Sequence, residues 1–486
     1  MRTESDLLGE FRIPDDKLYG IHSARAQLNF PEPAPFPLEW YQAIGTVKRA
    51  CYITYRHFRD TAGKKGLNPP AGHEWMSDQV LDALEESALE TEKGFHFDHF
   101  IVPAVQGGAG TSINMNINEI IANAALRKCG HQPGQYDVIH PLDHANIFQS
   151  TNDVVPTALH VALMKLSGSL ESALNNMREK LEELELSNRN ELRQSYTQMQ
   201  KAVPSSYGHL FGSYANAFSR DWWRVSRIKE RLKEINLGGG AAGTGLAIPR
   251  YFVLNVVPEL RNLTNFPLAH AENLADATMN QDTLVEVHAI IKALAVNLEK
   301  AGSDMRLLAA DLHAHQPLKL PKKQMGSSFM PGKINPVIPE YIISVAHKVY
   351  ANDQLVSGLC GQGCLDLNPY LPVTGTAMIE SFKFLEAACK SMKENMLNDL
   401  GTDPAREQED LFRSPSITTA LVPYIGHEKA EKMALEMKKT GLSVFEVNQK
   451  TETIDPQLLQ KLMTPSSLTA KGFSLKDIPP RPGDQG

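Results

Sequence analysis

A polar loop is predicted at residues 325–336, where the sequence reads MGSSFMPGKINP. Two glycines and two prolines in this stretch are incompatible with a regular helix. Ser327, Ser328, Lys333 and Asn335 nevertheless place hydroxyl, ammonium and amide donors close together. Donors of these three kinds can bind the oxygens of a small carboxylate, which makes the loop a candidate for substrate binding.

Three other segments carry the same kinds of side chain where helical patterns begin or are interrupted. They read QGGAGTSINMN, QSTNDVVP and QSYTQMQKAVP, and their candidate residues are Thr111, Ser150, Thr151, Asn152, Thr197 and Gln198. The start of a helix has free backbone N–H groups and the positive end of the helix dipole, which favours a bound carboxylate. A hydroxyl at a helix start is equally consistent with an N-cap, and only the four segments together favour a site for a small dianion.

Other classes of ligand are disfavoured by charge and by motif. The net charge is −7 with both signs mixed along the chain, so we expect no basic surface for nucleic acid. No G-x-x-x-x-G-K-[ST] phosphate loop occurs, and GGGAAGTG at 238–245 lacks the spacing of a dinucleotide site. Cys360 and Cys364 have no second Cys or His pair nearby at ligand spacing, so neither a metal nor a cofactor is predicted.

The sequence predicts a cytoplasmic protein. Its beginning, MRTESDLLGEF, is charged from the second residue and lacks the apolar run of a signal peptide. No stretch of about 18 apolar residues occurs, so no membrane partner is expected. The five scattered cysteines suit a reducing compartment better than a disulfide framework.

Long helices must position the polar segments. Two stretches place apolar residues at spacings of three and four, which is typical of a helix packed along its whole length. Their seam positions are Leu159, Leu163, Leu166, Leu170, Ala173, Met177, Leu181 and Leu184, and Leu284, Val287, Ile291, Leu294, Leu298, Ala301, Met305 and Leu308. Further helical patterns near 338–351 and 377–396 predict an elongated bundle.

The length of the chain suggests two or three domains. We expect a mixed, mainly helical N-terminal domain at 1–142, a central helical bundle at 143–400 and a small helical C-terminal domain at 401–486. The first region mixes short extended pieces with shorter helices, whereas two short amphipathic patterns follow residue 400.

The stretch GSSFMPGKINPVIPE resembles the signature loop of the aspartase/fumarase superfamily. The blocks GGAGTSINMNINEIIAN, QSTNDVVPTALH, LGGGAAGTG, ENLADATMNQD and SPSITTALVPYIG look like that family's other blocks, in its order, over roughly residues 5–465. The resemblance implies a mostly α, three-domain fold with a central long-helix bundle. It also implies a homotetramer whose active sites are shared between subunits, although a monomeric bundle remains an alternative.

The resemblance further implies elimination of a group beside a carboxylate-bearing carbon, releasing fumarate from a small dicarboxylate. Ser327 would be the base, and Lys333 and Asn335 would bind the carboxylate farther from the departing proton. The remaining roles follow from matching positions: Thr111, Ser150, Thr151 and Ser328 for the carboxylate that gains charge, and Asn152, Thr197 and Gln198 for the leaving group. Glu340 would support the site, or it would simply be a helix-start carboxylate stabilised by the dipole.

Among subfamilies, NPVIPE and ENLADATMNQD resemble the aspartate ammonia-lyases most closely. Four positions depart from the common pattern of the third segment, in three places: Ser195 with Tyr196, Gln198, and Lys201. The leading interpretation is reversible elimination of ammonia from L-aspartate. A class II fumarate hydratase, a lyase for a related amino-dicarboxylate and a catalytically silent structural relative are the alternatives.

Overall fold

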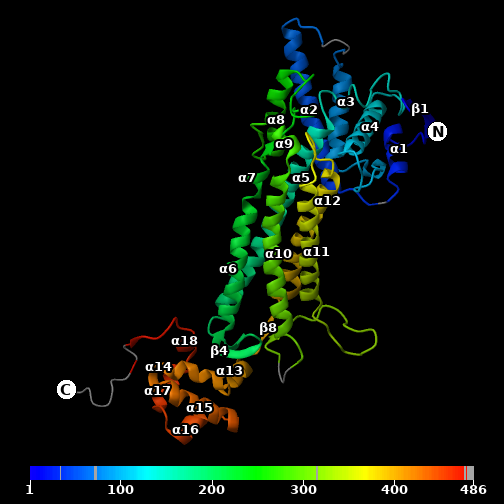
Figure 1. Cartoon of the computed structure of the whole chain (residues 1–486). Coiled ribbons are helices and arrows are strands. Elements are labelled where there is room, and N and C mark those ends of the chain that lie inside the picture. The colour runs from blue at the N-terminus through cyan, green and yellow to red at the C-terminus, as the bar shows by residue number, and fades with distance from the viewer. Residues whose placement is uncertain (33, 70–73, 313–315, 476–477, 479–486) are drawn as a thin grey trace. The chain divides into compact units, whose positions relative to one another are not determined.

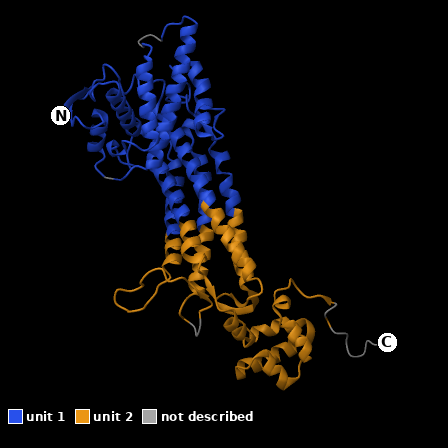
Figure 2. Cartoon of the chain, turned by 180° about the vertical axis from the view of Figure 1, so that it is seen from behind, with its two compact units in different colours: residues 1–172, 221–295, 345–387 blue, residues 173–220, 296–344, 388–486 orange. Residues whose placement is uncertain are grey.

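The computed structural model describes residues 1–32, 34–69, 74–312, 316–475 and 478. These residues form two compact units, which Figure 2 colours separately. Unit 1 comprises residues 1–172, 221–295 and 345–387, and unit 2 comprises residues 173–220, 296–344 and 388–486. Several long helices pass from one unit to the other along the chain, so each unit is assembled from three separate stretches of sequence.

Unit 1 is built mainly from helices (Figure 1). Its complete helices are α1 (Ile21–Asn29), α2 (Leu38–Lys64), α3 (Asp78–Glu92), the 3₁₀ turn η1 (Phe97–His99), α4 (Thr111–Lys128), α7 (Ile228–Leu232), α8 (Arg250–Thr264) and α9 (Asp276–Met279). It also contains parts of α5 (Thr151–Ser187), α6 (Tyr207–Ser226), α10 (Asp282–Leu308), α11 (Val337–Cys360) and α12 (Leu371–Met392). Two small sheets accompany them, the antiparallel pair β1 (Arg2–Asp6) and β2 (Gly9–Ile13) and the parallel pair β5 (Glu234–Ile235) and β6 (Ala269–His270).

Unit 2 contains the remaining parts of the long helices and the C-terminal elements. Its strands form two antiparallel pairs, β3 (Leu192–Thr197) with β4 (Gln200–Ser206) and β7 (Leu318–Lys319) with β8 (Gly401–Thr402). Its helices after α12 are the π-helical turn η2 (Lys393–Leu397), α13 (Pro404–Phe412), the 3₁₀ helix η3 (Pro415–Leu421), α14 (Val422–Ile425), α15 (His427–Thr440), α16 (Val444–Thr451), α17 (Pro456–Leu462) and α18 (Pro465–Leu468).

Both predicted seams lie on long helices. One is on α5 and the other on α10, and every seam position is buried except the last of each, Leu184 and Leu308, which are partly exposed. The Val, Leu, Ile and Met side chains removed from water in this way stabilise a fold by about 1.5–3 kcal/mol each. The seams are already covered within one chain, so their burial does not itself require a second copy.

A buried polar layer joins three helices of unit 1. His288 of α10 lies 3.0 Å from Asp353 of α11 through Nδ1 and 3.0 Å from Ser381 of α12 through Nε2. Burial lowers the pKa of His288, although Asp353 opposes that effect. These are the residue types of a hydrolase triad, but His288 and Ser381 are fully buried, and Ser381 donates its proton to the backbone oxygen of Ala377. The layer therefore joins helices and has no access for a substrate.

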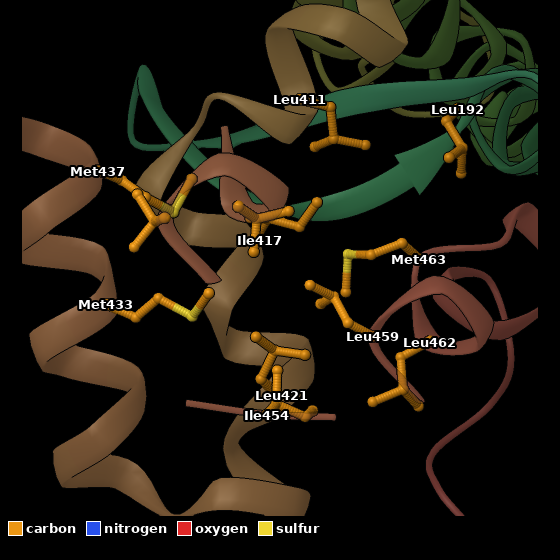
Figure 3. Packing of buried hydrophobic residues seen from close by; sticks show 12 residues of the cluster. Leu192, Leu411, Ile417, Leu421, Met433, Met437, Ile454, Leu459, Leu462 and Met463 are labelled. Carbon is orange, nitrogen blue, oxygen red and sulfur yellow. The ribbon is translucent and has the colours of Figure 1, made fainter. Parts of the chain in front are cut away.

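A separate apolar cluster holds the C-terminal helices together (Figure 3). Its buried members are Leu192, Leu411, Ile417, Leu421, Met433, Met437, Val444, Val447, Ile454, Leu459, Leu462 and Met463. Leu192 belongs to β3, so the cluster also fixes the first strand of the β3–β4 hairpin. This matters for the candidate site because the hairpin carries Thr197 and Gln198 at its turn.

The predicted fold class, mostly α with a central bundle of long helices, matches this architecture. Among the described residues, no helix combines the length and the apolar character needed to cross a bilayer. The boundaries 1–142, 143–400 and 401–486 stay a proposal for the division of the chain into three domains.

Candidate active site

The start of α4 presents Thr111 after a tight turn. Gly108, Ala109 and Gly110 all have positive φ, at 87°, 58° and 90°. This left-handed conformation favours glycine and is strained for alanine. A Cβ on Gly110 would lie 3.3 Å from Val155 and 3.8 Å from Thr151, so the turn packs directly on the first turn of α5. Thr111 is exposed at this point.

The start of α5 places Ser150, Thr151 and Asn152 beside that turn, each partly exposed. The Oγ1 atom of Thr151 accepts a hydrogen bond from Asn114 Nδ2 at 3.3 Å. Ser150 Oγ accepts the backbone N–H of Asn152 at 3.2 Å. Unit 1 therefore brings together the four hydroxyl and amide candidates from two helix N-termini, where backbone donors and the helix dipoles favour an anion.

The buried side chain of Asp153 fixes the backbone at the start of α5. Its carboxylate accepts the backbone N–H of Ser150 at 2.9 Å and that of Gly240 at 3.0 Å, and its side chain is fully buried. Burial raises the pKa of Asp153 to about 7, although the backbone donors and Lys48 favour the charged form. Sequence analysis missed this role, for which the only signal was an acidic residue in the first helical turn.

The glycine-rich segment 238–245 also fixes Asn152. Asn152 donates through Nδ2 to the backbone oxygen of Ala241 at 2.8 Å, and its own backbone oxygen accepts from Asn236 at 2.9 Å. The spacing of its glycines argues against a dinucleotide loop, and in the structure the segment supports the start of α5. One N–H of the Asn152 side chain is therefore already used in a hydrogen bond to the backbone.

A fully buried lysine lies close to the same place. Lys48 of α2 donates through Nζ to Gln149 Oε1 at 2.9 Å. Burial lowers the pKa of Lys48 to about 7, whereas Asp153 and Cys51 act in the opposite direction. Because Gln149 immediately precedes Ser150, this contact helps to fix the loop that leads into α5.

In unit 2, Thr197 and Gln198 lie at the turn of the β3–β4 hairpin. Thr197 pairs with Gln200, and the two central residues Gln198 and Met199 have φ of 51° and 62°. Two positive φ values are the signature of a type I′ turn, which normally contains glycine or asparagine. Thr197 and Gln198 are both exposed. Backbone strain of this kind, at residues whose side chains are exposed, is often found at functional sites.

In the loop at 325–336, two backbone N–H groups donate to the hydroxyl of Ser327. Ser327 Oγ accepts the backbone N–H of Met330 at 2.8 Å and that of Phe329 at 3.1 Å. Two such donors would stabilise a negative charge on this oxygen. Ser328 is exposed beside it, and Phe329 is 90% exposed, so the loop projects into solvent.

The two ends of this loop are tied together at Gly326. Its N–H donates to the backbone oxygen of Lys333 at 2.8 Å, and its own oxygen accepts from Asn335 Nδ2 at 2.6 Å. The side chain of Lys333 is exposed and Asn335 is partly buried. Asn335 thus has a structural contact in addition to its predicted role in binding a carboxylate.

Glu340 lies in the first turn of α11 and forms an ion pair with Arg306, with Nη2 to Oε1 at 3.2 Å. Both side chains are about half exposed, so solvent weakens the pair. This contact agrees with the simpler interpretation of Glu340 as a helix-start carboxylate. A supporting role in the site stays a prediction.

The candidate residues therefore fall into two groups. Thr111, Ser150, Thr151 and Asn152 belong to unit 1, whereas the following belong to unit 2: Thr197, Gln198, Ser327, Ser328, Lys333, Asn335 and Glu340. Each group collects hydroxyl, amide or ammonium donors suited to a carboxylate. Among the described residues, no group of three or more His, Cys, Asp or Glu side chains is arranged to hold a metal ion.

Gly326 provides a test of the loop geometry. A Cβ at this position would lie 2.6 Å from the backbone nitrogen of Asn335 and 2.7 Å from the backbone oxygen of Lys333. Gly326→Ala should therefore open the loop and lower kcat/KM by about 10²-fold, since small misplacements of reacting groups have effects of this size. The measurement is the steady-state rate of the elimination that the family resemblance implies, with the midpoint of thermal unfolding recorded in parallel.

The matched control is Gly358→Ala. Gly358 lies on α11, and a Cβ there would meet no atom of another described segment within 4 Å. This variant should keep full activity and gain up to about 1 kcal/mol of stability, because alanine favours a helix over glycine. Full activity in Gly326→Ala would contradict the requirement for a closed loop.

Comparison with known proteins gives a consistent picture. The family described as "Lyase" matches residues 9–351, and the family described as "Fumarase C C-terminus" matches residues 417–470. An aspartate ammonia-lyase of a Bacillus species is 34% identical over 98% of both chains. The aspartate ammonia-lyase of Escherichia coli strain K12 is 36% identical over 92% of this chain and 91% of its own.

Two solved structures have the same fold. The cobalt-bound "fumarate lyase:delta crystallin" of Brucella melitensis has a TM-score of 0.89 and 31% identity, covering 97% of this chain and all of its own. A class II fumarase of Schistosoma mansoni has a TM-score of 0.85 and 25% identity, covering 96% of this chain and 98% of its own. The predicted family resemblance, the fold class and the prediction of a carbon–nitrogen lyase are confirmed.

Proposed function

This chain belongs to the lyase family, and we propose that it eliminates ammonia reversibly from L-aspartate to give fumarate, with Ser327 as the base. The observation that carries this proposal is the likeness to aspartate ammonia-lyases over almost the whole length of the chain. The substrate is then a small dicarboxylate, and the protein is a cytoplasmic homotetramer with active sites shared between subunits.

Proton removal is the difficult step. The hydrogen on the carbon beside a carboxylate is weakly acidic, and its loss places a second negative charge on that carboxylate. A base must lie at the carbon, and donors must already surround the oxygens. Ser327 is suited to the first task because the N–H groups of Phe329 and Met330 point at its Oγ and would stabilise an alkoxide.

The second task falls to the remaining hydroxyls. Thr111, Ser150, Thr151 and Ser328 would donate to the carboxylate that gains charge. Lys333 and Asn335 would bind the other carboxylate, the lysine by its charge and the asparagine by orienting an oxygen. Glu340 would support this loop through α11.

Asn152, Thr197 and Gln198 would face the departing amine. Near neutral pH this amine is already an ammonium group, so it leaves without a proton from the enzyme. A glutamine cannot titrate, but its oxygen accepts a hydrogen bond from an ammonium group. The absence of an acid at Gln198 is therefore compatible with loss of ammonia.

Hydration of fumarate is the second candidate, because a class II fumarase is among the structures with the same fold. Hydroxide is a poor leaving group and needs a proton from an acid at the site or through an ordered water. A lyase acting on a related amino-dicarboxylate would use the same residues. A silent structural relative is disfavoured, since Ser327, Lys333 and Asn335 are all present.

The decisive experiment compares L-aspartate with L-malate. We expect fumarate release from L-aspartate and a kcat/KM for L-malate lower by at least about 10²-fold at every pH between 6 and 9, since no titrating acid is available at Gln198. The absorbance of fumarate is followed for both substrates and for argininosuccinate. Comparable turnover of malate would overturn the assignment to ammonia loss.

The variant Gln198→Ala separates the role of this residue from the assignment. We expect kcat for L-aspartate to fall by about tenfold, as for one lost hydrogen bond to a charged group. An unchanged rate would remove Gln198 from the site and leave the substrate assignment intact.

A further inference from the structure

We propose that Asn114 and Asn146 form a relay of two amides that fixes the hydroxyl of Thr151 as a hydrogen-bond donor to the substrate. Thr151 lies at the start of α5, and Asn114 projects from α4 into the same place. This inference deepens the proposed function and depends on it, because it concerns the carboxylate that gains charge during elimination.

A backbone carbonyl determines how the first amide of the relay is oriented. Asn146 donates through Nδ2 to the backbone oxygen of Gln149 at 3.1 Å. A carbonyl oxygen only accepts, so the nitrogen of this amide must face Gln149 and its oxygen must face away. That oxygen accepts a hydrogen bond from Asn114 Nδ2 at 3.0 Å. The orientation of the first amide thereby determines the orientation of the second.

The second amide then determines the hydroxyl. Asn114 directs the same Nδ2 group at Thr151 Oγ1, at 3.3 Å. With one lone pair of Thr151 occupied by this donor, the O–H proton is left to donate elsewhere. Thr151 is partly exposed at the helix N-terminus, so its proton can reach a carboxylate bound there.

The opposite oxygen of Asn114 supports this direction. Asn114 is 2% exposed, and its Oδ1 has no hydrogen-bond partner among the residues that the structure describes. An unpaired buried acceptor is unfavourable, yet reversing the amide would place Oδ1 against the oxygen of Asn146. The relay therefore keeps the nitrogen toward Thr151 at the expense of one unsatisfied oxygen.

The origin of the relay is itself held in place. The backbone N–H of Gln149 donates to the backbone oxygen of Asn146 at 3.0 Å, which closes a short turn. Lys48 anchors the side chain of Gln149 at 2.9 Å. The relay thus runs from the fixed backbone carbonyl of Gln149 to the hydroxyl of Thr151. Asn114 and Asn146 are positioning residues, because neither needs to touch the substrate.

The chemical consequence concerns the transition state. The carboxylate beside the departing proton carries more negative charge in the transition state than in bound substrate. A donor that already points at it therefore accelerates the reaction more than it tightens binding. Loss of the relay should lower kcat and leave KM nearly unchanged.

The test is a double-mutant cycle with Asn114→Leu and Thr151→Val. Asn114→Leu alone should lower kcat for L-aspartate by about tenfold, and in the Thr151→Val background it should cause no further loss, because the hydroxyl on which it acts is absent. In the Thr151→Ser background the effect of Asn114→Leu should return, since the hydroxyl is restored. Independent, multiplying effects of the two changes would overturn the relay.

The matched control is Asn118→Leu. Asn118 lies one turn farther along α4 and is fully buried. Within the described part of the chain its Oδ1 also lacks a partner, but its Nδ2 donates to Met115 Sδ, at 3.8 Å, and not to a site residue. It should keep the parent kcat. Loss in Asn118→Leu equal to that in Asn114→Leu would reduce the effect to general packing of α4 and overturn the relay.

Two further arms keep the test decisive. If Asn114→Leu does not fold, Asn146→Ala breaks the relay one step earlier and should give the same cycle with Thr151→Val. If the parent releases no fumarate from L-aspartate, the proposed function fails. The same cycle is then read by calorimetry from the dissociation constant of 3-nitropropionate in its nitronate form, which carries the extra negative charge of the transition state; non-additive weakening supports the relay and additive weakening overturns it.

Discussion

Replacing Ser327 with alanine should reduce the release of fumarate from L-aspartate by about 10²–10⁴-fold, the usual loss when a general base is removed. In the structure, the oxygen that would be deleted accepts the backbone N–H groups of Phe329 and Met330. An alkoxide at this position would be stabilised by both donors, whereas a methyl group cannot accept a proton. The readout is kcat measured from fumarate absorbance.

Binding separates loss of chemistry from loss of structure. The Ser327→Ala variant should bind fumarate within a few-fold of the parent, since the other carboxylate donors remain. Ser344→Ala is the matched control, because Ser344 is an exposed serine of α11 that donates to the backbone oxygen of Glu340. It should keep the parent rate. Turnover by Ser327→Ala within about tenfold of the parent would remove Ser327 from the role of base.

The long helices could be predicted because their signal is local. Apolar residues that recur every three and four positions produce a face that must be buried, and the seams on α5 and α10 were found in this way. The same signal does not identify the surface that covers such a face. The seam residue Ile291, for example, is fully buried by elements of its own chain.

The turn at Gln198 was not predictable from residue type. A type I′ hairpin is normally predicted from Asn-Gly or Gly-Gly at its centre, whereas here glutamine and methionine adopt positive φ. Residue types alone identify the segment as polar and as an interruption of helical patterning, and its role at the leaving group comes from the family resemblance. Its strands are instead determined by tertiary packing, since Leu192 of β3 belongs to the C-terminal apolar cluster.

The contacts that fix the loop carrying Ser150 and Thr151 could not be predicted from the sequence either. Asp153 bonds to Gly240, and Lys48 reaches Gln149, so the partners are separated by 87 and 101 positions. Nothing in the local pattern pairs such residues. Hydroxyls and amides at helix starts were identified because their positions follow from capping rules, whereas their orientation depends on contacts that only the folded chain creates.

The division of the candidate residues between two units has a consequence for assembly. Thr151 belongs to unit 1 and Ser327 to unit 2. If active sites are shared between subunits, as proposed, one site takes these two residues from different chains. Two inactive variants, each damaged in one unit, can then complement each other.

Mixed tetramers of Thr151→Val and Ser327→Ala should therefore regain activity. Alone, the first variant should keep about 1% of the parent kcat, as for loss of an oxyanion donor, and the second about 1% to 0.01%. In a random one-to-one mixture, each site receives an intact Thr151 with a probability of one half and an intact Ser327 with the same probability. About a quarter of the sites are then fully intact, provided that the two residues come from different subunits.

The measurement uses two differently tagged chains that are co-expressed, purified through both tags and assayed with L-aspartate. Native mass spectrometry establishes that the chains have mixed and that four are present. Activity near a quarter of the parent, more than tenfold above either variant, requires a site built from different chains. Mixed tetramers that keep only the mean activity of the two variants would mean that Thr151 and Ser327 act within one subunit, because no arrangement of singly damaged chains could then create an intact site.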